Sequence, residues 1–184
     1  WIIKEKRIGE KFNNTIFQKE SSKNIEKCEY ILKRINEGIQ ILQENSNAKL
    51  AFKLMNQSMY LQQMHYKIEN YSKKINYKKE LKKIKKGNWR PFQLAFILLN
   101  IKSFIDPNSE DRNIMDLIWF PTGGGKTEAY LGLTSFTIFL RKIISKDIKG
   151  CAVLMRYTLR LLTTQQFERA ASLICACEFI RRKN

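Results

Sequence analysis

The segment Pro121-Thr-Gly-Gly-Gly-Lys-Thr127 constrains the fold of this 184-residue chain more than any other. A mostly apolar run, residues 114–120, precedes it, and a stretch with helical spacing, residues 128–144, follows it. Three consecutive glycines permit backbone conformations and a close approach that a Cβ atom would block. This order predicts a buried strand, a tight loop and a helix that begins at the loop.

A loop in this position is suited to binding phosphate groups. Its amide N–H groups and the N-terminus of the following helix converge on an anion. We expect Lys126 to reach the β- and γ-phosphates of ATP and the Thr127 hydroxyl to join Mg²⁺ coordination, which makes these two residues the catalytic candidates. The alternative is a glycine-rich turn that binds nothing. The predicted nucleotide-binding residues here are Thr122, Gly123, Gly124, Gly125, Lys126, Thr127 and Glu128.

The rest of the second half predicts further alternating elements. A helix is expected over residues 92–101 and a polar loop over 103–113. A second strand is expected over 151–156, followed by a helix over 163–182. Strand, helix, strand and helix in short succession predict an α/β fold with a parallel sheet flanked by helices.

The first half predicts helices only. Apolar residues recur at steps of three and four over residues 25–42, and at helical spacing again over residues 54–71. Because a short polar link, residues 44–48, separates these stretches, we expect an antiparallel helical hairpin. We therefore divide the chain into a basic helical region, residues 1–88, and a second domain that begins at residue 89.

The net charge of +17 is unusual for a chain of this length and suggests a polyanionic partner. Residues 1–90 contain 21 basic and 9 acidic residues and so hold most of the excess. No stretch is long and apolar enough to span a bilayer, and the start lacks the layout of a signal peptide, so no membrane partner is expected. Because the sequence begins with Trp1, we expect it to be a fragment.

The lysine-rich segment of residues 73–86 has eight lysines and one glutamate, with apolar residues at helical spacing. Three interpretations remain open. The lysines can form a solvated face over a packed apolar stripe, contact a phosphate backbone, or attach the chain to a membrane surface.

The cysteines and the single histidine predict no metal site made of protein ligands. Cys28, Cys151, Cys175 and Cys177 are unevenly spaced, and the gap between the last two is not the one that zinc sites use. The pattern is that of reduced cysteines in a cytoplasmic protein.

Residues 121–127 resemble motif I of superfamily 2 helicases and translocases. The general phosphate-loop pattern has glycine where this chain has Phe120, a departure that disfavours a phosphate-loop kinase. Upstream, Arg90-Pro-Phe-Gln93 resembles the element in which a glutamine reads adenine and an aromatic residue packs nearby. The resemblance therefore adds Arg90 and Gln93 to the nucleotide-binding set. Without this context, Gln93 is equally well a surface glutamine of a helix.

The segment Arg160-Leu-Leu-Thr-Thr-Gln165 resembles motif Ia, which contacts the phosphates of a nucleic-acid strand. Thr158 and Leu159 replace the Pro-Thr that usually precedes it. The alternative is that the arginines cap a strand end or pair with Glu168. The resemblance assigns nucleic-acid contacts to Arg156, Thr158, Arg160 and Gln165.

Longer blocks resemble the helicase subunit of the DISARM anti-phage system. They lie within residues 51–56, 89–96, 117–132, 154–167 and 174–178. The resemblance implies ATP- and Mg²⁺-dependent action on DNA, as a single strand or a duplex junction, alongside other defence subunits. It also implies that residues 89–184 are the first part of a RecA-like helicase domain with a parallel sheet.

The acidic pair that such motors use to hold Mg²⁺ and activate water does not follow Thr127 in this sequence. We therefore expect the longer parent, and not this fragment, to hydrolyse ATP. The alternative function is a non-enzymatic helical module that binds nucleic acid or a partner and has a regulatory nucleotide site.

Overall fold

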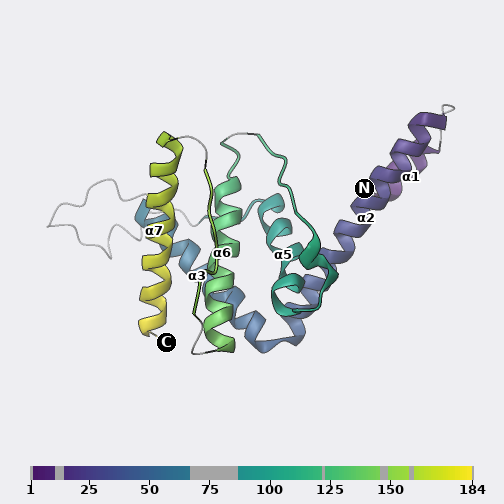
Figure 1. Cartoon of the computed structure of the whole chain (residues 1–184). Coiled ribbons are helices and arrows are strands. Elements are labelled where there is room, and N and C mark those ends of the chain that lie inside the picture. Colours follow the sequence, from purple (N-terminus) through teal and green to yellow (C-terminus); the bar gives the residue numbers. More distant parts are fainter. Residues whose placement is uncertain are drawn as a thin grey trace. The chain divides into compact units, whose positions relative to one another are not determined.

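The computed structural model describes residues 2–10, 15–66, 87–121, 123–145, 149–157 and 160–183 (Figure 1). Within these ranges, the side chains of Thr15, Tyr66 and residues 160–163 are not described. The chain divides into two compact units, residues 1–41 with 98–114 and residues 42–97 with 115–184. Each unit draws on both sides of the expected boundary at residue 89, which stays a prediction.

The described residues of the first unit form four helical elements. Two of these helices lie close together at Gly38, and a Cβ atom on this residue would collide with the carbonyl oxygen of Leu98. The helix predicted over residues 25–42 is confirmed and begins earlier than expected. The elements are α1 (Ile2–Gly9), α2 (Thr15–Glu44) as far as residue 41, the second part of α5 (Pro91–Ile105), and the 3-10 helix η1 (Glu110–Asn113).

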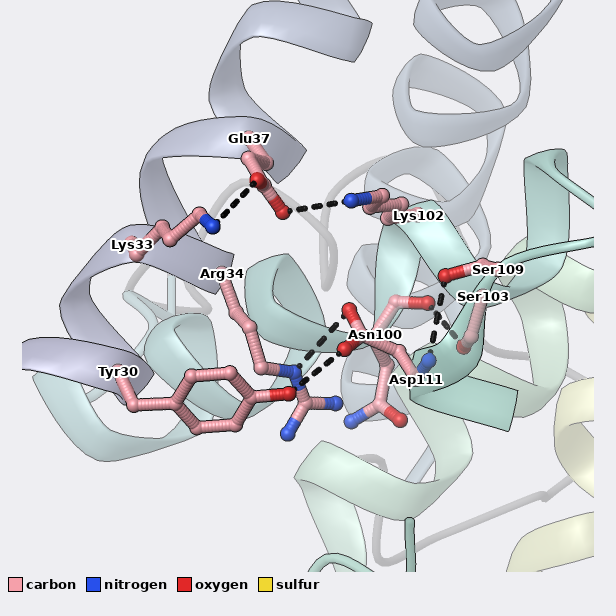
Figure 2. A network of polar contacts seen from close by, with 9 residues as sticks. All are labelled: Tyr30, Lys33, Arg34, Glu37, Asn100, Lys102, Ser103, Ser109 and Asp111. Carbon is pink, nitrogen blue, oxygen red and sulfur yellow. Dashed lines mark hydrogen bonds and ion pairs between the residues drawn. The ribbon is translucent and has the colours of Figure 1, made fainter. Parts of the chain in front are cut away.

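A polar network joins α2 to η1 within this unit (Figure 2). Nε of Arg34 lies 3.3 Å from a carboxylate oxygen of Asp111, and both side chains are almost fully buried. The Tyr30 hydroxyl donates to the other Asp111 oxygen at 3.0 Å. Desolvation first, and then the bond to Asp111, raise the pKa of Tyr30. Beside this cluster, Lys102 of α5 pairs with Glu37 of α2 at 3.0 Å.

The second unit is built on α3 (Ser46–Tyr66), which packs against both α6 (Lys126–Ile144) and α7 (Arg160–Lys183) (Figure 1). The side chain of Asn45 accepts a hydrogen bond from the Ala48 amide at 3.0 Å and so caps the start of α3. The three helices share an apolar core. Its buried side chains include Ala51, Met55, Met59, Leu131, Phe136, Leu140, Leu173 and Ile180.

One polar spot lies inside this apolar core. The hydroxyls of Ser58 on α3 and Ser135 on α6 lie 2.6 Å apart, and the Cys177 sulfur of α7 lies 3.5 Å from the Ser135 hydroxyl. Because the Ser58 hydroxyl donates to the carbonyl oxygen of Met55, Ser135 donates to Ser58 and the Cys177 thiol donates to Ser135. Burial raises the pKa of the Cys177 thiol, so it stays protonated.

The predicted parallel sheet, and with it the α/β class and the RecA-like domain, is wrong for this structure. The described residues contain helices and no strand, so the fold is all-helical. Residues 114–120 and 151–156, where the strands were predicted, belong to no helix or strand, and a strand requires a neighbouring backbone to pair with. Along the first segment the alternate side chains of Met115, Leu117 and Trp119 are exposed instead of buried.

The remaining sequence predictions for this region fare differently. The helices expected over residues 92–101, 128–144 and 163–182 are confirmed as parts of α5, α6 and α7. The lysine-rich segment of residues 73–86 lies outside the described residues. No helix that the structure describes has an apolar stretch long enough to cross a bilayer.

Candidate functional site

The glycine loop leads directly into α6, as the sequence predicts. Gly123 and Gly125 have φ values of +77° and +89°, in the left-handed region where a side chain is strained. Gly125 is the N-cap residue of α6. A hydrogen bond of 3.1 Å from the Gly124 amide to the carbonyl oxygen of Pro121 closes the turn. The glycines are therefore required by the backbone at two of three positions.

The Lys126 side chain folds back over this loop. Its Nζ donates to the carbonyl oxygens of Phe120 at 2.5 Å and Pro121 at 3.2 Å. Both acceptors are neutral carbonyls, which an anionic phosphate oxygen can replace with a stronger, charge-assisted bond. The ammonium group of Lys126 is thus held at the loop by two carbonyl oxygens, neither of which carries a charge.

Phe120, which stands where most phosphate loops have glycine, packs beneath the loop. Its ring stacks on Phe92 of α5, with centroids 4.1 Å apart and an interplanar angle of 17°. A Cβ atom at Gly124 would lie 2.7 Å from Cε1 of Phe120. Gly124 is therefore needed because the aromatic ring occupies the space beside it.

Gln93 connects the start of α5 to the same loop. Its Oε1 accepts from the backbone amide of Arg90 at 2.8 Å, the reach-back bond that caps a helix N-terminus. Its Nε2 donates to the carbonyl oxygen of Gly125 at 2.7 Å. The Arg90 guanidinium donates to the carbonyl oxygen of Gly124 at 2.7 Å. Both polar atoms of Gln93 are thus bonded to backbone, and its role in reading adenine stays a prediction.

Trp89 fixes the chain just before α5 against two other helices. Its indole Nε1 donates to Oδ1 of Asn56 on α3 at 2.7 Å. Its ring lies against Gly132 of α6, where a Cβ atom would come within 2.7 Å of it. The start of α5, and with it Gln93, is therefore positioned by α3 and α6.

These elements surround a cleft of about 630 Å³ in the second unit. This volume lies within the range of small-molecule sites. Glu128 of α6 and Arg169 of α7 form an ion pair. With three basic side chains and one acidic, the lining favours an anionic ligand. The lining comprises Gln63, Asn88, Arg90, Gln93, Gly123, Gly125, Lys126, Thr127, Glu128, Gln166 and Arg169.

The contribution of α7 to this cleft is not among the sequence predictions. Gln166 and Arg169 are three residues apart and share one helix face with the buried Leu173, Cys177 and Ile180. Their position is visible in the sequence, because the two polar residues continue the apolar stripe of this helix. Gln63 and Asn88 also line the cleft, and no comparable pattern in the sequence indicates them.

The residues predicted to contact nucleic acid are described in part. Arg156 and Gln165 are exposed, as is Glu168. Thr158 lies outside the described residues, as does Thr122 of the loop, and of Arg160 only the backbone at the start of α7 is described. Nowhere in the described ranges do three His, Cys, Asp or Glu side chains gather to hold a metal ion.

Comparison with known proteins identifies a relative among the proteins of anti-phage defence. In an alignment of 177 residues that covers 91% of this chain, the chain is 45% identical to the DISARM protein DrmA of Bacillus paralicheniformis. It spans only 16% of the length of that protein. No protein-family model matches the chain. The similarity supports the DISARM resemblance, whereas the assignment to superfamily 2 helicases stays a prediction.

Proposed function

We propose that this chain, as a relative of the DISARM protein DrmA, acts in anti-phage defence and binds the phosphates of ATP at its glycine loop. We further propose that the longer protein uses ATP hydrolysis to act on DNA as a helicase or translocase, alongside other subunits of the defence system. This chain by itself is expected to bind nucleotide without hydrolysing it.

The observation that carries the proposal is the arrangement of the loop in the cleft. Two glycines with positive φ lead into the N-terminus of α6. Lys126 and Thr127 follow them in the sequence and also line the cleft. Arg90 and Arg169 add positive charge to the same lining. Helix N-terminus, lysine and arginines together match the three negatively charged groups of a triphosphate.

The residues present also fit a magnesium ion that arrives with the nucleotide. Mg²⁺ is commonly held by few protein ligands together with substrate phosphates and water. Thr127 lines the cleft next to Lys126, and its hydroxyl would be the protein ligand. The bound ion would neutralise charge on the phosphates. Glu128, which pairs with Arg169, would keep that guanidinium beside the loop.

The test of nucleotide binding is Lys126→Ala, measured by calorimetric titration with Mg·ATP. Loss of a charge-assisted bond predicts a decrease in affinity of at least about tenfold. Lys142→Ala, an exposed lysine near the end of the same helix, is the control and is expected to bind normally. If Lys126→Ala binds ATP as the unmodified chain does, the phosphate-loop proposal is wrong. In the longer protein, Lys126→Ala is expected to abolish ATP hydrolysis.

The proposed contact with DNA is tested by its salt dependence. Each lysine or arginine that neutralises a phosphate contributes roughly 0.7 to 0.9 to the log–log slope of affinity against salt. Arg156 is exposed, and Arg156→Gln is expected to lower the slope by about that amount. An unchanged slope would remove Arg156 from the DNA-binding surface.

A further inference from the structure

One residue that lines the cleft has a buried polar atom that the phosphate site does not explain. Oε1 of Gln166 is buried and has no hydrogen-bond partner among the described residues. Gln166 lies in the lining of the cleft, on the wall that α7 contributes. A buried acceptor without a partner destabilises the folded protein, so such atoms are uncommon and call for an explanation.

The position of Gln166 is set by the packing of α7 in the core. It lies seven residues before the fully buried Leu173 and therefore on the same face of α7. Arg169 lies between them on this face and pairs with Glu128 of α6. The amide of Gln166 is thus held at the cleft by the same helix face that anchors α7 in the core.

The chemistry of an acceptor limits what can satisfy it. Phosphate oxygens of a nucleotide are themselves acceptors at neutral pH, so they cannot bond to Oε1 of Gln166. The donors in the lining that suit phosphates are Lys126, Arg90 and Arg169. The group that satisfies Gln166 must instead carry an N–H or O–H, and in a nucleotide these are found on the base and the ribose.

We propose that Gln166 binds the nucleoside part of the nucleotide by accepting a hydrogen bond from its amino or hydroxyl group. This inference rests on the proposed ATP-binding function and adds a residue to it. Gln166 thereby makes the cleft selective for nucleotides over inorganic polyphosphates, which the loop and the basic side chains bind equally well.

The test compares two ligands on two matched variants. Gln166→Met removes the acceptor and keeps the length of the side chain, whereas Gln57→Met makes the same change at an exposed site on α3. Calorimetric titration is carried out with Mg·ATP and with Mg·tripolyphosphate. Gln166→Met is expected to weaken ATP binding about 3- to 10-fold, the value of one neutral hydrogen bond, and to leave tripolyphosphate binding unchanged. Gln57→Met is expected to change neither.

Two further measurements identify the donor and exclude a folding defect. Inosine triphosphate lacks the 6-amino group of ATP, and deoxy-ATP lacks its 2′-hydroxyl. The affinity of each analogue is compared between the unmodified chain and Gln166→Met. If an analogue binds both equally well, the group that it lacks is the donor to Gln166. Without ligand, the thermal midpoint of Gln166→Met is expected to equal or exceed that of the unmodified chain, because a buried unsatisfied acceptor has been removed.

The outcomes separate this inference from the function on which it rests. If Gln166→Met weakens the binding of both ligands equally, or of neither, the proposed role of Gln166 is contradicted. The proposal that ATP binding depends on Lys126 is unaffected by that result. If the unmodified chain binds neither ligand, or if Lys126→Ala binds ATP normally, the proposed function is wrong and this inference fails with it.

Discussion

The side-chain amide of Gln93 donates a hydrogen bond of 2.7 Å to the carbonyl oxygen of Gly125, the residue that caps α6. The same amide accepts from the backbone of Arg90, which caps α5. With only 4% of its surface exposed, Gln93 therefore links the first turns of two helices. Gln93 thus couples the glycine loop to the start of α5, together with the hydrogen bond from the Arg90 guanidinium to the Gly124 carbonyl oxygen.

Replacing Gln93 by methionine is expected to lower the free energy of unfolding by about 1–3 kcal/mol, because two backbone groups lose their partner. Urea unfolding followed by circular dichroism measures the change. Gln57→Met, the exposed site on α3, is expected to unfold like the unmodified chain. A Gln93→Met variant of unaltered stability would show that the link does not hold the loop.

The glycines of the loop are expected to differ in their tolerance of alanine. Gly123→Ala places a side chain at positive φ but meets no described atom within 4 Å, so it should cost about 1–2 kcal/mol. Gly125→Ala has the same strain and also puts its Cβ 2.8 Å from Nε2 of Gln93. It should therefore be the more destabilising of the two in urea unfolding. Equal losses of stability would mean that Gln93 moves aside freely.

The buried pair of Arg34 and Asp111 is expected to be sensitive to the loss of one partner. Arg34→Met leaves the Asp111 carboxylate buried with only the Tyr30 hydroxyl as a donor among the contacts of its two oxygens. The expected loss of stability is about 3–5 kcal/mol, measured by chemical unfolding.

The control for this pair is the double variant Arg34→Met with Asp111→Leu, which removes both charges. It is expected to be more stable than Arg34→Met alone, because no uncompensated charge is left in the interior. If the double variant is the less stable, the ion pair contributes through packing and not through charge.

The cysteines are expected to differ in reactivity with a thiol reagent. Cys151 and Cys175 are exposed, whereas Cys177 is buried and donates to Ser135. Since only the thiolate reacts and burial raises the pKa of Cys177, raising the pH to 8 should label the exposed pair and leave Cys177 unlabelled until the chain unfolds. Mass spectrometry of the labelled peptides measures this order. Rapid labelling of Cys177 in the folded chain would contradict the buried contact.

The helices of this protein are predictable from its sequence because their signal is local. Apolar residues at steps of three and four indicate α2 and α7 as helices, and Pro91 marks the first turn of α5. In α7 the apolar residues form a buried stripe, whereas Leu32 and Ile39 of α2 are exposed. The glycine loop is predictable for the same reason, since positive φ and the start of α6 are properties of neighbouring residues.

The expected sheet shows where local reasoning ends. A short apolar run such as residues 114–120 fits a buried strand, but a strand exists only where another backbone pairs with it. Pairing depends on residues distant in sequence, which apolar spacing does not identify. In the structure the core of the second unit is completed by α3, α6 and α7, and Trp119 remains exposed.

The residues that the glycine loop contributes to the cleft could be predicted from the sequence, whereas those from α7 could not. Residues 123–127 form a contiguous motif, so the sequence identifies them together. Gln166 and Arg169 come from a distant helix, and only the rotation of α7 about its axis turns them to the cleft. That rotation is set by the buried Leu173 and Ile180, whose spacing in the sequence indicates which face of α7 turns inward.

The contact of Ser58 with Ser135 has a consequence for how α3 and α6 find their alignment. Apolar side chains can slide past one another by a helical turn of about 5.4 Å at modest cost. Such a slide would separate the two buried hydroxyls and leave that of Ser135 without its acceptor, which is unfavourable. The hydrogen bond between the two hydroxyls thus favours one axial register of the two helices over the neighbouring registers.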